Sequence, residues 1–463
     1  MRLWHRWSRA SVRFDEENLV SCAGLVPVMA LAERAGMSQL VAEKVEITNA
    51  PIPSTGANPA GKIAAIVAGM VAGADCIDDL DVIRHGGMKR LFSGVYAPST
   101  LGSFLRSFTH GHVLQLTAVL RAMLATLAMT TPVLAGAEQM TYVDIDSLLR
   151  RVYGKKKRGA RFGPAKVGGY SLLLRGLSPL VATISTPLAA PLIAAMRLRG
   201  GNAGSARGAA GLLAEALNTA KASGARGMIL VRADSAYYAG TVVSAARRAA
   251  ARFSITVTGN SAIQAAIATI PDDAWIPVRY PGAVEDPDTG KLISDAEVAE
   301  TVYTAFAGTS HEVTARLVVR RVKDQNHTDV LFPVWRYHAF LTDTALSTVE
   351  ADLTHRRHAV VETTFADLID GPLAHLPSGH FDANAAWAVC AAISHNLLRA
   401  TGSTASIFHT TARGATLRRH LVCVPARLAR PQGREILHLP GYWPWADAFA
   451  GLHDAATRPP PAA

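Results

Sequence analysis

The sequence predicts an α/β protein with an all-helical region at its start and a β-rich insertion later in the chain. Apolar residues recur at three- and four-residue spacing up to about residue 135, as in amphipathic helices. From Thr141 onward, short strand-like segments are bounded by Gly or Pro. Helix-like and strand-like segments then alternate between about 205 and 258, which is typical of a layered α/β domain.

The helical region is expected over residues 1–135, with helices near 26–35, 63–74, 101–108 and 113–127 separated by Gly, Pro and Asn. The first part of an α/β core is expected over residues 136–271. Its strands are predicted near 141–154, 168–176, 192–198, 228–235 and 254–258, and its helices over 205–223, capped by Ser205, and 241–252.

The later part of the chain changes pattern twice. Strand-like segments with turn residues between them predict the β-rich insertion over residues 272–345. Helical patterns return at 353–369 and 383–400, which places the second part of the core at 346–402. Residues 403–463 are expected to form a C-terminal extension.

Composition narrows the class of protein. The 463 residues contain 49% hydrophobic and 18% charged residues, which argues against intrinsic disorder. Lys and Arg total 47 against 36 Asp and Glu, so the net charge is +11 without an extended basic tail. The four cysteines lie far apart, and the basic N-terminal segment lacks an apolar stretch behind it. We therefore expect a cytoplasmic protein without disulfides, structural zinc or a membrane span.

Two carboxylates share one face of a predicted strand. In the segment Tyr142-Val143-Asp144-Ile145-Asp146, period-two alternation places Tyr142, Asp144 and Asp146 together. Acidic groups on a central strand are costly to desolvate unless a metal, a base or water compensates. The alternative is an edge strand whose acidic face is solvated.

Two further acids occupy informative positions. Asp234 follows the apolar segment 228–231, at a strand end where ligand sites of α/β sheets lie, although an Asp there is also a common helix cap. Glu362 lies on a predicted helix with an apolar stripe, where a surface position is the alternative. Three converging carboxylates would repel one another without divalent cations, and Mg²⁺ prefers oxygen ligands. Two such ions can catalyse phosphodiester cleavage and strand transfer.

Four segments resemble insertion-sequence transposases of the DDE class, and they most resemble the 1380 family of insertion sequences. These segments are DIDS (144–147), RADS (232–235), HRRHAVVETTFADL (355–368) and FDANAAWAVCAAISHNLLRA (381–400). The resemblance implies an RNase H-like catalytic domain with catalytic and metal-binding residues Asp146, Asp234 and Glu362. Asp146 is preferred as the first catalytic Asp because Ser147 follows it, whereas Asp144 stays open as the alternative first Asp and as a metal ligand.

The same resemblance implies a bacterial, nucleoid-associated enzyme that acts on double-stranded DNA. It would use Mg²⁺, with Mn²⁺ as a substitute, to release a 3′-hydroxyl at transposon ends and join it to target DNA, as a homodimer in the DNA complex. Related enzymes have a Tyr, an Arg and a Lys around the catalytic Glu, where this chain has His355, His358 and Ile369. His355, Arg356 and His358 are expected to contact phosphate, whereas Ile369 cannot.

These replacements leave two alternatives open: a catalytically impaired DNA-binding protein derived from a transposase, and a metal-dependent nuclease without strand transfer. A basic, Gly-containing run after the first strand is expected to bind the DNA backbone, with a solvated hairpin as the alternative. The run consists of Arg150, Arg151, Lys155, Lys156, Lys157, Arg158, Arg161 and Lys166. The Gly-rich segment 200–205 lacks the spacing of a nucleotide-binding loop, so we expect no nucleotide cofactor.

Overall fold

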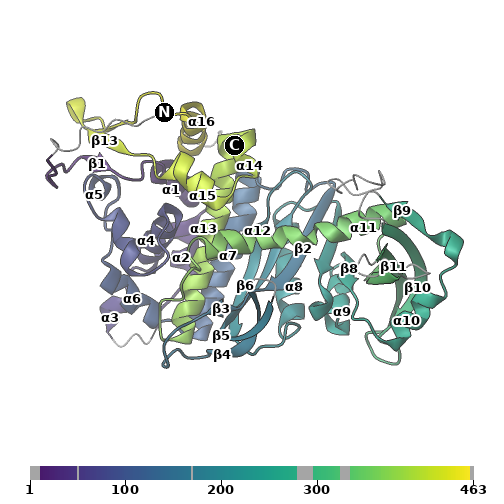
Figure 1. The fold of residues 1–463 in the computed structure, drawn as a ribbon. Helices are drawn as coiled ribbons and strands as arrows, with labels where there is room; N and C mark the ends of the chain where they lie inside the picture. Colours follow the sequence, from purple (N-terminus) through teal and green to yellow (C-terminus); the bar gives the residue numbers. More distant parts are fainter. Residues whose placement is uncertain (1–10, 49–51, 168–169, 279–295, 324–333, 459–463) are drawn as a thin grey trace.

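The computed structural model describes residues 11–48, 52–167, 170–278, 296–323 and 334–458. Figure 1 shows a helical part, drawn mainly in purple and yellow, beside a large sheet with its covering helices. The long helix α13 (Phe381–Ala405) runs between these two parts, and both chain termini lie on the helical side.

The first described section, up to Thr130, is mostly helical. Pro at the start of three of its helices, and Gly73 as the C-cap of α4, fit the helix-boundary preferences of these residues. A short strand, β1 (Leu19–Val20), precedes the helices. The helices are α1 (Leu25–Arg34), α2 (Met37–Lys44), α3 (Pro53–Gly56), α4 (Pro59–Ala72), the 3-10 helix η2 (Asp78–Ile83), α5 (Met88–Leu91), α6 (Pro98–Arg106) and α7 (His110–Thr130).

An 11-stranded sheet forms the other part of the molecule, in the order β3-β5-β2-β7-β8-β12-β11-β10-β9, with β4 and β6 paired to β5. Within it, β2, β5 and β6 are antiparallel neighbours, whereas β7 and β8 run parallel to β2. Their bounds are β2 (Met140–Ser147), β3 (Arg150–Arg151), β4 (Arg161–Val167), β5 (Tyr170–Ser185), β6 (Leu192–Gly200), β7 (Met228–Ala233) and β8 (Arg252–Thr256).

The strands expected as an insertion extend this same sheet. β12 pairs antiparallel with β8, with Phe340 opposite Thr256, so the later strands continue the hydrogen-bonded ladder of the core. The strands are β9 (Ile276–Val278), β10 (Ala296–Ala305), β11 (Val313–Lys323) and β12 (Trp335–Thr342).

Helices cover the sheet and correct two details of the sequence analysis. They are α8 (Ala209–Ala222), η3 (Ser235–Tyr237), α9 (Gly240–Arg248), α10 (Ser261–Ala268), η4 (Asp272–Ala274), α11 (Thr348–Arg356), η5 (Arg357–Ala359) and α12 (Val360–Ile369). The predicted Ser205 cap is wrong, because α8 begins after Gly208, whose φ of 77° suits glycine. The single helix predicted at 353–369 is also wrong. Instead, the 3-10 turn η5 separates α11 from α12.

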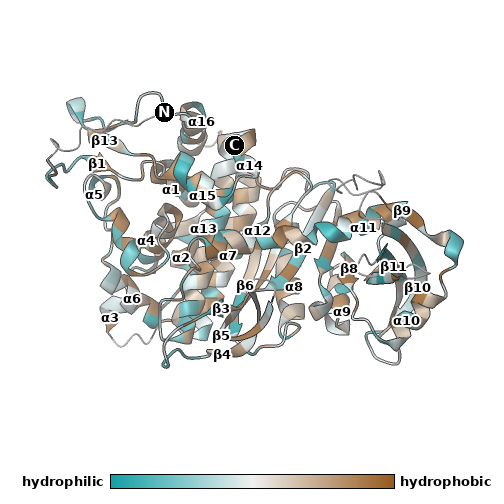
Figure 2. Ribbon diagram, in the orientation of Figure 1, coloured by the Kyte–Doolittle hydropathy of each residue, from teal (hydrophilic) through white to brown (hydrophobic). Residues whose placement is uncertain are grey.

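The C-terminal elements pack against the first helices. α13 contacts α4, α7 and β6, and it is buried from Ala383 to Gly402, with polar residues among the apolar ones (Figure 2 colours the ribbon by hydropathy). β13 pairs with β1, and α16 contacts α1. The remaining elements are α14 (Ile407–Thr410), α15 (Gly414–Leu417), η6 (Arg418–Val422), β13 (Ala426–Ala429), η7 (Pro431–Gly433), β14 (Ile436–His438) and α16 (Ala446–Thr457).

The apolar helix α7 could by its length and hydropathy be either a membrane span or a core helix. Among the described residues it is the one helix with the length and hydropathy to cross a membrane. The same pattern is found in core helices of globular proteins, and α7 packs against α2, α13 and β6. Its apolar surface is therefore partly accounted for by contacts within the chain.

Candidate active site

Two carboxylates meet at the ends of neighbouring parallel strands. Asp146 lies at the end of β2, half-buried, and its Oδ1 accepts a hydrogen bond from the backbone N–H of Ser147 at 2.6 Å. Asp234 directly follows β7. The register pairs Ile145 with Ala233, so continuing it by one residue sets Asp146 beside Asp234. Both side chains are therefore at the carboxyl edge, where ligand sites of α/β sheets form.

Asp234 is both a cap and a candidate ligand. Its Oδ1 accepts a hydrogen bond from the backbone N–H of Ala236 at 3.0 Å and caps the 3-10 turn η3. Its two oxygens have several lone pairs, so this bond leaves acceptor capacity free. The cap holds the carboxylate in a fixed position at the strand end.

Helix α12 contributes the third carboxylate. Val361, Phe365 and Leu368 form its buried stripe, whereas Glu362 is exposed in the first turn. α12 contacts β2, and the charges of Glu362 and Asp234 both act on Asp146. Burial, opposed by the Ser147 hydrogen bond and reinforced by these two charges, raises the pKa of Asp146 from its ordinary value of 3.8 to about 7. The three acids thus form one electrostatic cluster.

The donor set of this cluster fits divalent cations. All three side chains offer carboxylate oxygens, which Mg²⁺ prefers, and the half-buried Asp146 is destabilised by two negative neighbours. A bound cation would remove that repulsion. The chemistry of the donor set therefore suits Mg²⁺, but in the part of the chain that the structure describes the three acids do not form a group with all ligand atoms within 4.8 Å of one another.

Comparison with known families decides the class of protein. A family model described as Transposase DDE domain group 1 matches residues 5–459. The chain belongs to this family of DDE transposases. No curated protein matches the chain. Members of the DDE class act on DNA and generally use divalent metal ions, so the carboxylate cluster lies in a transposase.

Asp144 in this transposase has a different environment from Asp146. Both of its oxygens accept hydrogen bonds from Arg232, each at 2.7 Å, and both side chains are almost fully buried. Arg232 also donates to the carbonyl of Thr354 at 2.9 Å and lies over the ring of Tyr142. The metal-ligand role left open for Asp144 does not fit, because its carboxylate is engaged in a buried bidentate ion pair.

His355 does not fit its expected contact with phosphate. It is buried and stacked on Phe340, and its ring nitrogens form hydrogen bonds with the hydroxyls of Ser254 (2.8 Å) and Thr256 (2.9 Å). Burial, together with the positive potential of His358 and Arg232, lowers its pKa to about 3. The ring is therefore neutral and structural at physiological pH.

The neighbouring positions remain closer to the surface. His358 is half-buried and its Nδ1 donates to the carbonyl oxygen of His355 at 2.9 Å. Arg356 is exposed at the end of α11. Their expected phosphate contacts stay predictions.

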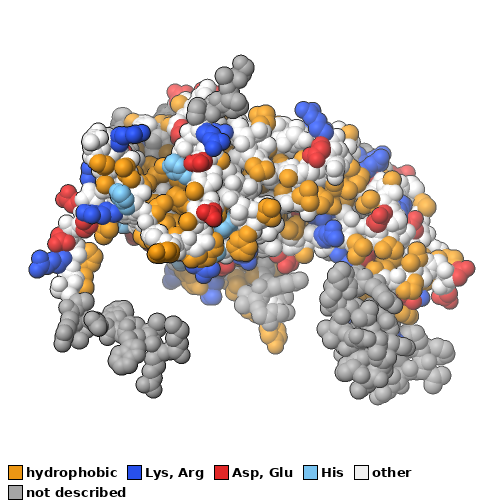
Figure 3. Space-filling view, turned by 90° about the horizontal axis from the view of Figure 1, so that it is seen from above, with side chains coloured by type: hydrophobic (Ala, Val, Ile, Leu, Met, Phe, Trp, Pro, Cys, Tyr) orange, Lys and Arg blue, Asp and Glu red, His pale blue; other side chains and the backbone are white. Residues whose placement is uncertain are grey.

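The basic run divides into two groups. Arg150 and Lys157 donate to the carbonyls of Ala374 (2.8 Å for Arg150) and Leu376, so they tether the loop after α12. The other described members, Arg151, Lys155, Lys156, Arg158 and Arg161, are exposed, and the side chain of Lys166 lies outside the described residues. The face seen from above in Figure 3 shows Lys and Arg spread among other side chains, so positive charge is not confined to this run.

Two residues near the cluster were not found from the sequence. Arg199 on β6 is buried and donates to the carbonyls of Ser205 and Arg207, each at 2.9 Å, and its charge also acts on Asp146. Tyr237 is fully buried close to Asp146, and its hydroxyl lies near Ser147 and Arg199 without reaching hydrogen-bond geometry to any described residue. Tyr237 follows Asp234 by three residues, a spacing that could have indicated it, whereas nothing in the sequence indicated Arg199.

A separate group of possible metal ligands lies in the helical part. Asp75, Cys76 and Asp79 place one ligand atom each within 4.8 Å of one another, in the part of the chain that the structure describes. Asp79 is exposed, and Asp75 is paired with Nδ1 of His375 at 2.9 Å. Exposed acidic groups often gather in this way without an ion, so the group does not define a metal site.

Proposed function

We propose that this transposase cleaves transposon ends and joins the freed 3′-hydroxyl to target DNA, with Asp146, Asp234 and Glu362 as its catalytic, metal-binding residues. The observation that carries the proposal is the convergence of three carboxylates from separate segments: burial raises the pKa of Asp146, and the charges of Asp234 and Glu362 raise it further. Two divalent cations, Mg²⁺ or Mn²⁺, would supply activation of the attacking hydroxyl and stabilisation of the leaving oxygen when bound.

Each residue has a distinct position in this proposal. Asp146 is held by β2 and by the N–H of Ser147, and Asp234 is held by its capping bond to Ala236. Glu362 is exposed, so its carboxylate is accessible from solvent. The fixed strand-end carboxylates would define the position of the scissile phosphate, and the helix-borne Glu362 would complete the ligand set.

The proposal includes an RNase H-like core and membership of the 1380 family of insertion sequences. The order β6-β5-β2-β7-β8, with three antiparallel strands followed by two parallel ones, supports that core. The helical region up to residue 135 would bind the DNA ends, a homodimer would hold two ends together, and the enzyme would act at the bacterial nucleoid in the cytoplasm. No nucleotide cofactor takes part in this scheme.

Substitution of the acids tests the proposal directly. Asp234→Asn and Glu362→Gln should abolish Mg²⁺-dependent cleavage of DNA that carries the flanks of the element. Asp370→Asn is a matched control, because Asp370 is an exposed acid that directly follows α12 and pairs with Arg413. Cleavage at the parental rate by either test variant would contradict the proposal. Sequencing of joined product strands would separate a transposase from a nuclease without strand transfer.

A catalytically impaired DNA-binding protein is the second candidate, and the state of His355 favours it. The position expected to contact phosphate is occupied by a buried, neutral ring. This candidate predicts salt-sensitive binding to the element ends with no strand cleavage in Mg²⁺ or Mn²⁺. Cleavage in either metal would exclude it.

A further inference from the structure

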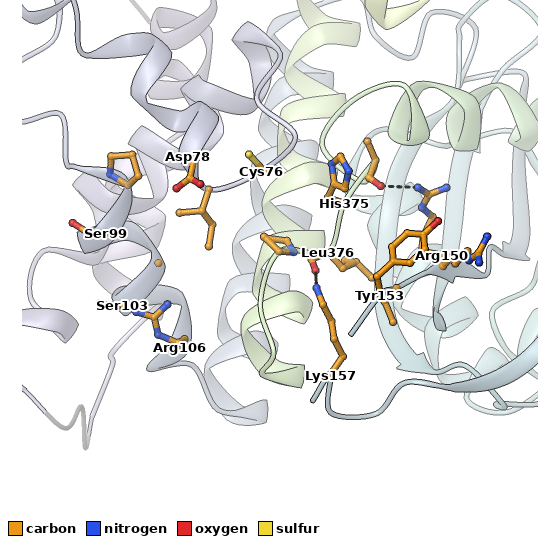
Figure 4. Close-up of a pocket in the computed structure, with 17 residues that line it drawn as sticks. Cys76, Asp78, Ser99, Ser103, Arg106, Arg150, Tyr153, Lys157, His375 and Leu376 are labelled. Carbon is orange, nitrogen blue, oxygen red and sulfur yellow. Dashed lines mark hydrogen bonds between the residues drawn. The ribbon is translucent and has the colours of Figure 1, made fainter. Parts of the chain in front are cut away.

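A cavity of about 860 Å³ separates the helical part of the molecule from the sheet, and none of the three carboxylates lines it. Figure 4 shows Ser103 and Arg106 of α6 on one side, Arg150 and Tyr153 on the other, and the loop residues His375 and Leu376 between them. The cavity is open to solvent and large enough to admit a sizeable ligand.

Positive charge predominates around the cavity. Its permanently charged lining residues are Arg106, Arg150, Arg151 and Lys157, against the single acid Asp78. Within the described ranges, none of these four cations forms an ion pair with a carboxylate. Cations that face one space without acidic partners favour an anionic ligand.

Neutral groups already hold these cations in place. Arg106 donates to the hydroxyl of Ser103 at 2.9 Å, and the guanidinium of Arg151 lies 4.8 Å from the ring centre of Tyr153. Arg150 uses one nitrogen for the carbonyl of Ala374, while its buried Nε has no hydrogen-bond partner. Burial lowers the pKa of Arg150 and Lys157, because no carboxylate repays the desolvation of their charges. An anion in the cavity would supply that compensation.

The cavity also lies at a suitable distance from the carboxylate cluster. The chain runs from Asp146 at the end of β2 to Arg150 in β3 in four residues, which spans at most about 13 Å at the rise of an extended strand. One strand of duplex DNA advances about 3.4 Å per nucleotide. A strand with its reacting phosphate at Asp146 would therefore reach the cavity within roughly four nucleotides.

We propose that this cavity binds the phosphate backbone of the DNA strand that leaves the carboxylate cluster, with Arg106 on the helical wall and Arg151 on the sheet wall contacting the same strand. This inference rests on the proposed action on DNA and adds where the DNA runs. It also gives the helical part a specific role, because Arg106 lies outside the basic run identified in the sequence.

The experiment measures the salt dependence of binding. Arg106→Gln, Arg151→Gln and the double variant are compared in an Asp234→Asn background, so that binding is observed without cutting. The probe is a fluorescently labelled duplex of mixed sequence, and log Kd is plotted against log salt concentration. Both arginines are exposed, so these variants should keep the thermal melting temperature of the parent. Arg248→Gln on α9, which does not line the cavity, is the matched control.

Each single variant loses one phosphate contact, so the slope of log Kd against log salt concentration should fall by about 0.9. The double variant loses two contacts, so its slope should fall by about 1.8. Arg248→Gln should keep the parental slope. An unchanged slope for either Arg106→Gln or Arg151→Gln would overturn the proposal, because both walls must contact the strand. Failure of the proposed catalysis would instead appear as Mg²⁺-dependent cleavage by Asp234→Asn or by Glu362→Gln, and binding slopes measured in a chelating buffer stay separate from that outcome.

Discussion

Replacement of Asp146 by Asn should stabilise the metal-free protein at pH 8 while abolishing DNA cleavage. Asp146 is half-buried, and its pKa in the folded chain is about 7, against an ordinary value of 3.8. The folded state therefore binds the proton more tightly than the unfolded state. The contribution of the protonated Asp146 carboxyl to the free energy of unfolding is therefore fully present below pH 3.8. That contribution is lost as pH rises through 7.

The magnitude follows from the two pKa values. Their difference corresponds to about 4 kcal/mol at pH 8, which is an upper limit for the gain on removing the charge. At pH 5 the same relation gives a gain of about 2 kcal/mol, because the folded carboxyl is then largely protonated. The assay is urea unfolding of parent and Asp146→Asn in a chelating buffer at both pH values. Addition of Mg²⁺ should stabilise the parent more than the variant.

Asp144→Asn is the control on the same strand, and its effect should have the opposite sign. It would leave Arg232 buried without a carboxylate, and breaking a buried ion pair by removing one partner costs about 3–5 kcal/mol. Equal stability of Asp146→Asn and parent at pH 8 without metal would refute the reasoning about the cluster. A stabilising Asp144→Asn would show that the two acids have been assigned the wrong roles.

Three further predictions concern buried groups outside the carboxylate cluster. His355→Ala should cost about 2–4 kcal/mol in urea unfolding, since two hydroxyls lose their partner, and should leave the salt slope of DNA binding unchanged. In the parent, the low pKa of His355 should contribute a loss of stability as pH falls from 6.5 towards 3. Tyr237→Phe should keep or raise stability within about 1–3 kcal/mol, because it removes an unpartnered buried hydroxyl; a clear loss would mean that the hydroxyl is bonded. Diamide should join Cys22 to Cys423, whose sulfurs lie 3.9 Å apart, and mass spectrometry should find both protected from alkylation, whereas separate labelling would contradict that pairing.

Much of the secondary structure could be predicted from apolar periodicity. The helices predicted at 101–108 and 113–127 correspond to α6 and α7, and the strand predicted at 254–258 overlaps β8. The break between α11 and α12 could not be predicted, because residues 357–359 contain neither Gly nor Pro and continue the helical pattern. The pairing of β12 with β8 was equally hidden, since strand pairing depends on tertiary register and not on local sequence.

The acids of the candidate site could be proposed from the sequence, but their environments could not. Alternation correctly placed Asp144 and Asp146 on one face, yet only the pairing of β2 with β7 brings Arg232 against Asp144. His355 lies within the same segment as Glu362 and looked available to solvent. Its burial results from contacts with β8 and β12, which are distant in the sequence.

The register of β2 and β7 explains why one acid is compensated and the next is not. Asp144 lies opposite Arg232, so the first charged position on this face is a buried ion pair. Two residues further along both strands the same face presents Asp146 and Asp234, so an attractive pair is followed by a repulsive one. Arg232 cannot relieve that repulsion, because Asp144, Thr354 and Tyr142 already engage its guanidinium. The surplus negative charge at the strand ends favours either a proton on Asp146 or a cation from outside the chain, which is the physical basis for proposing the metal ions there and not at Asp144.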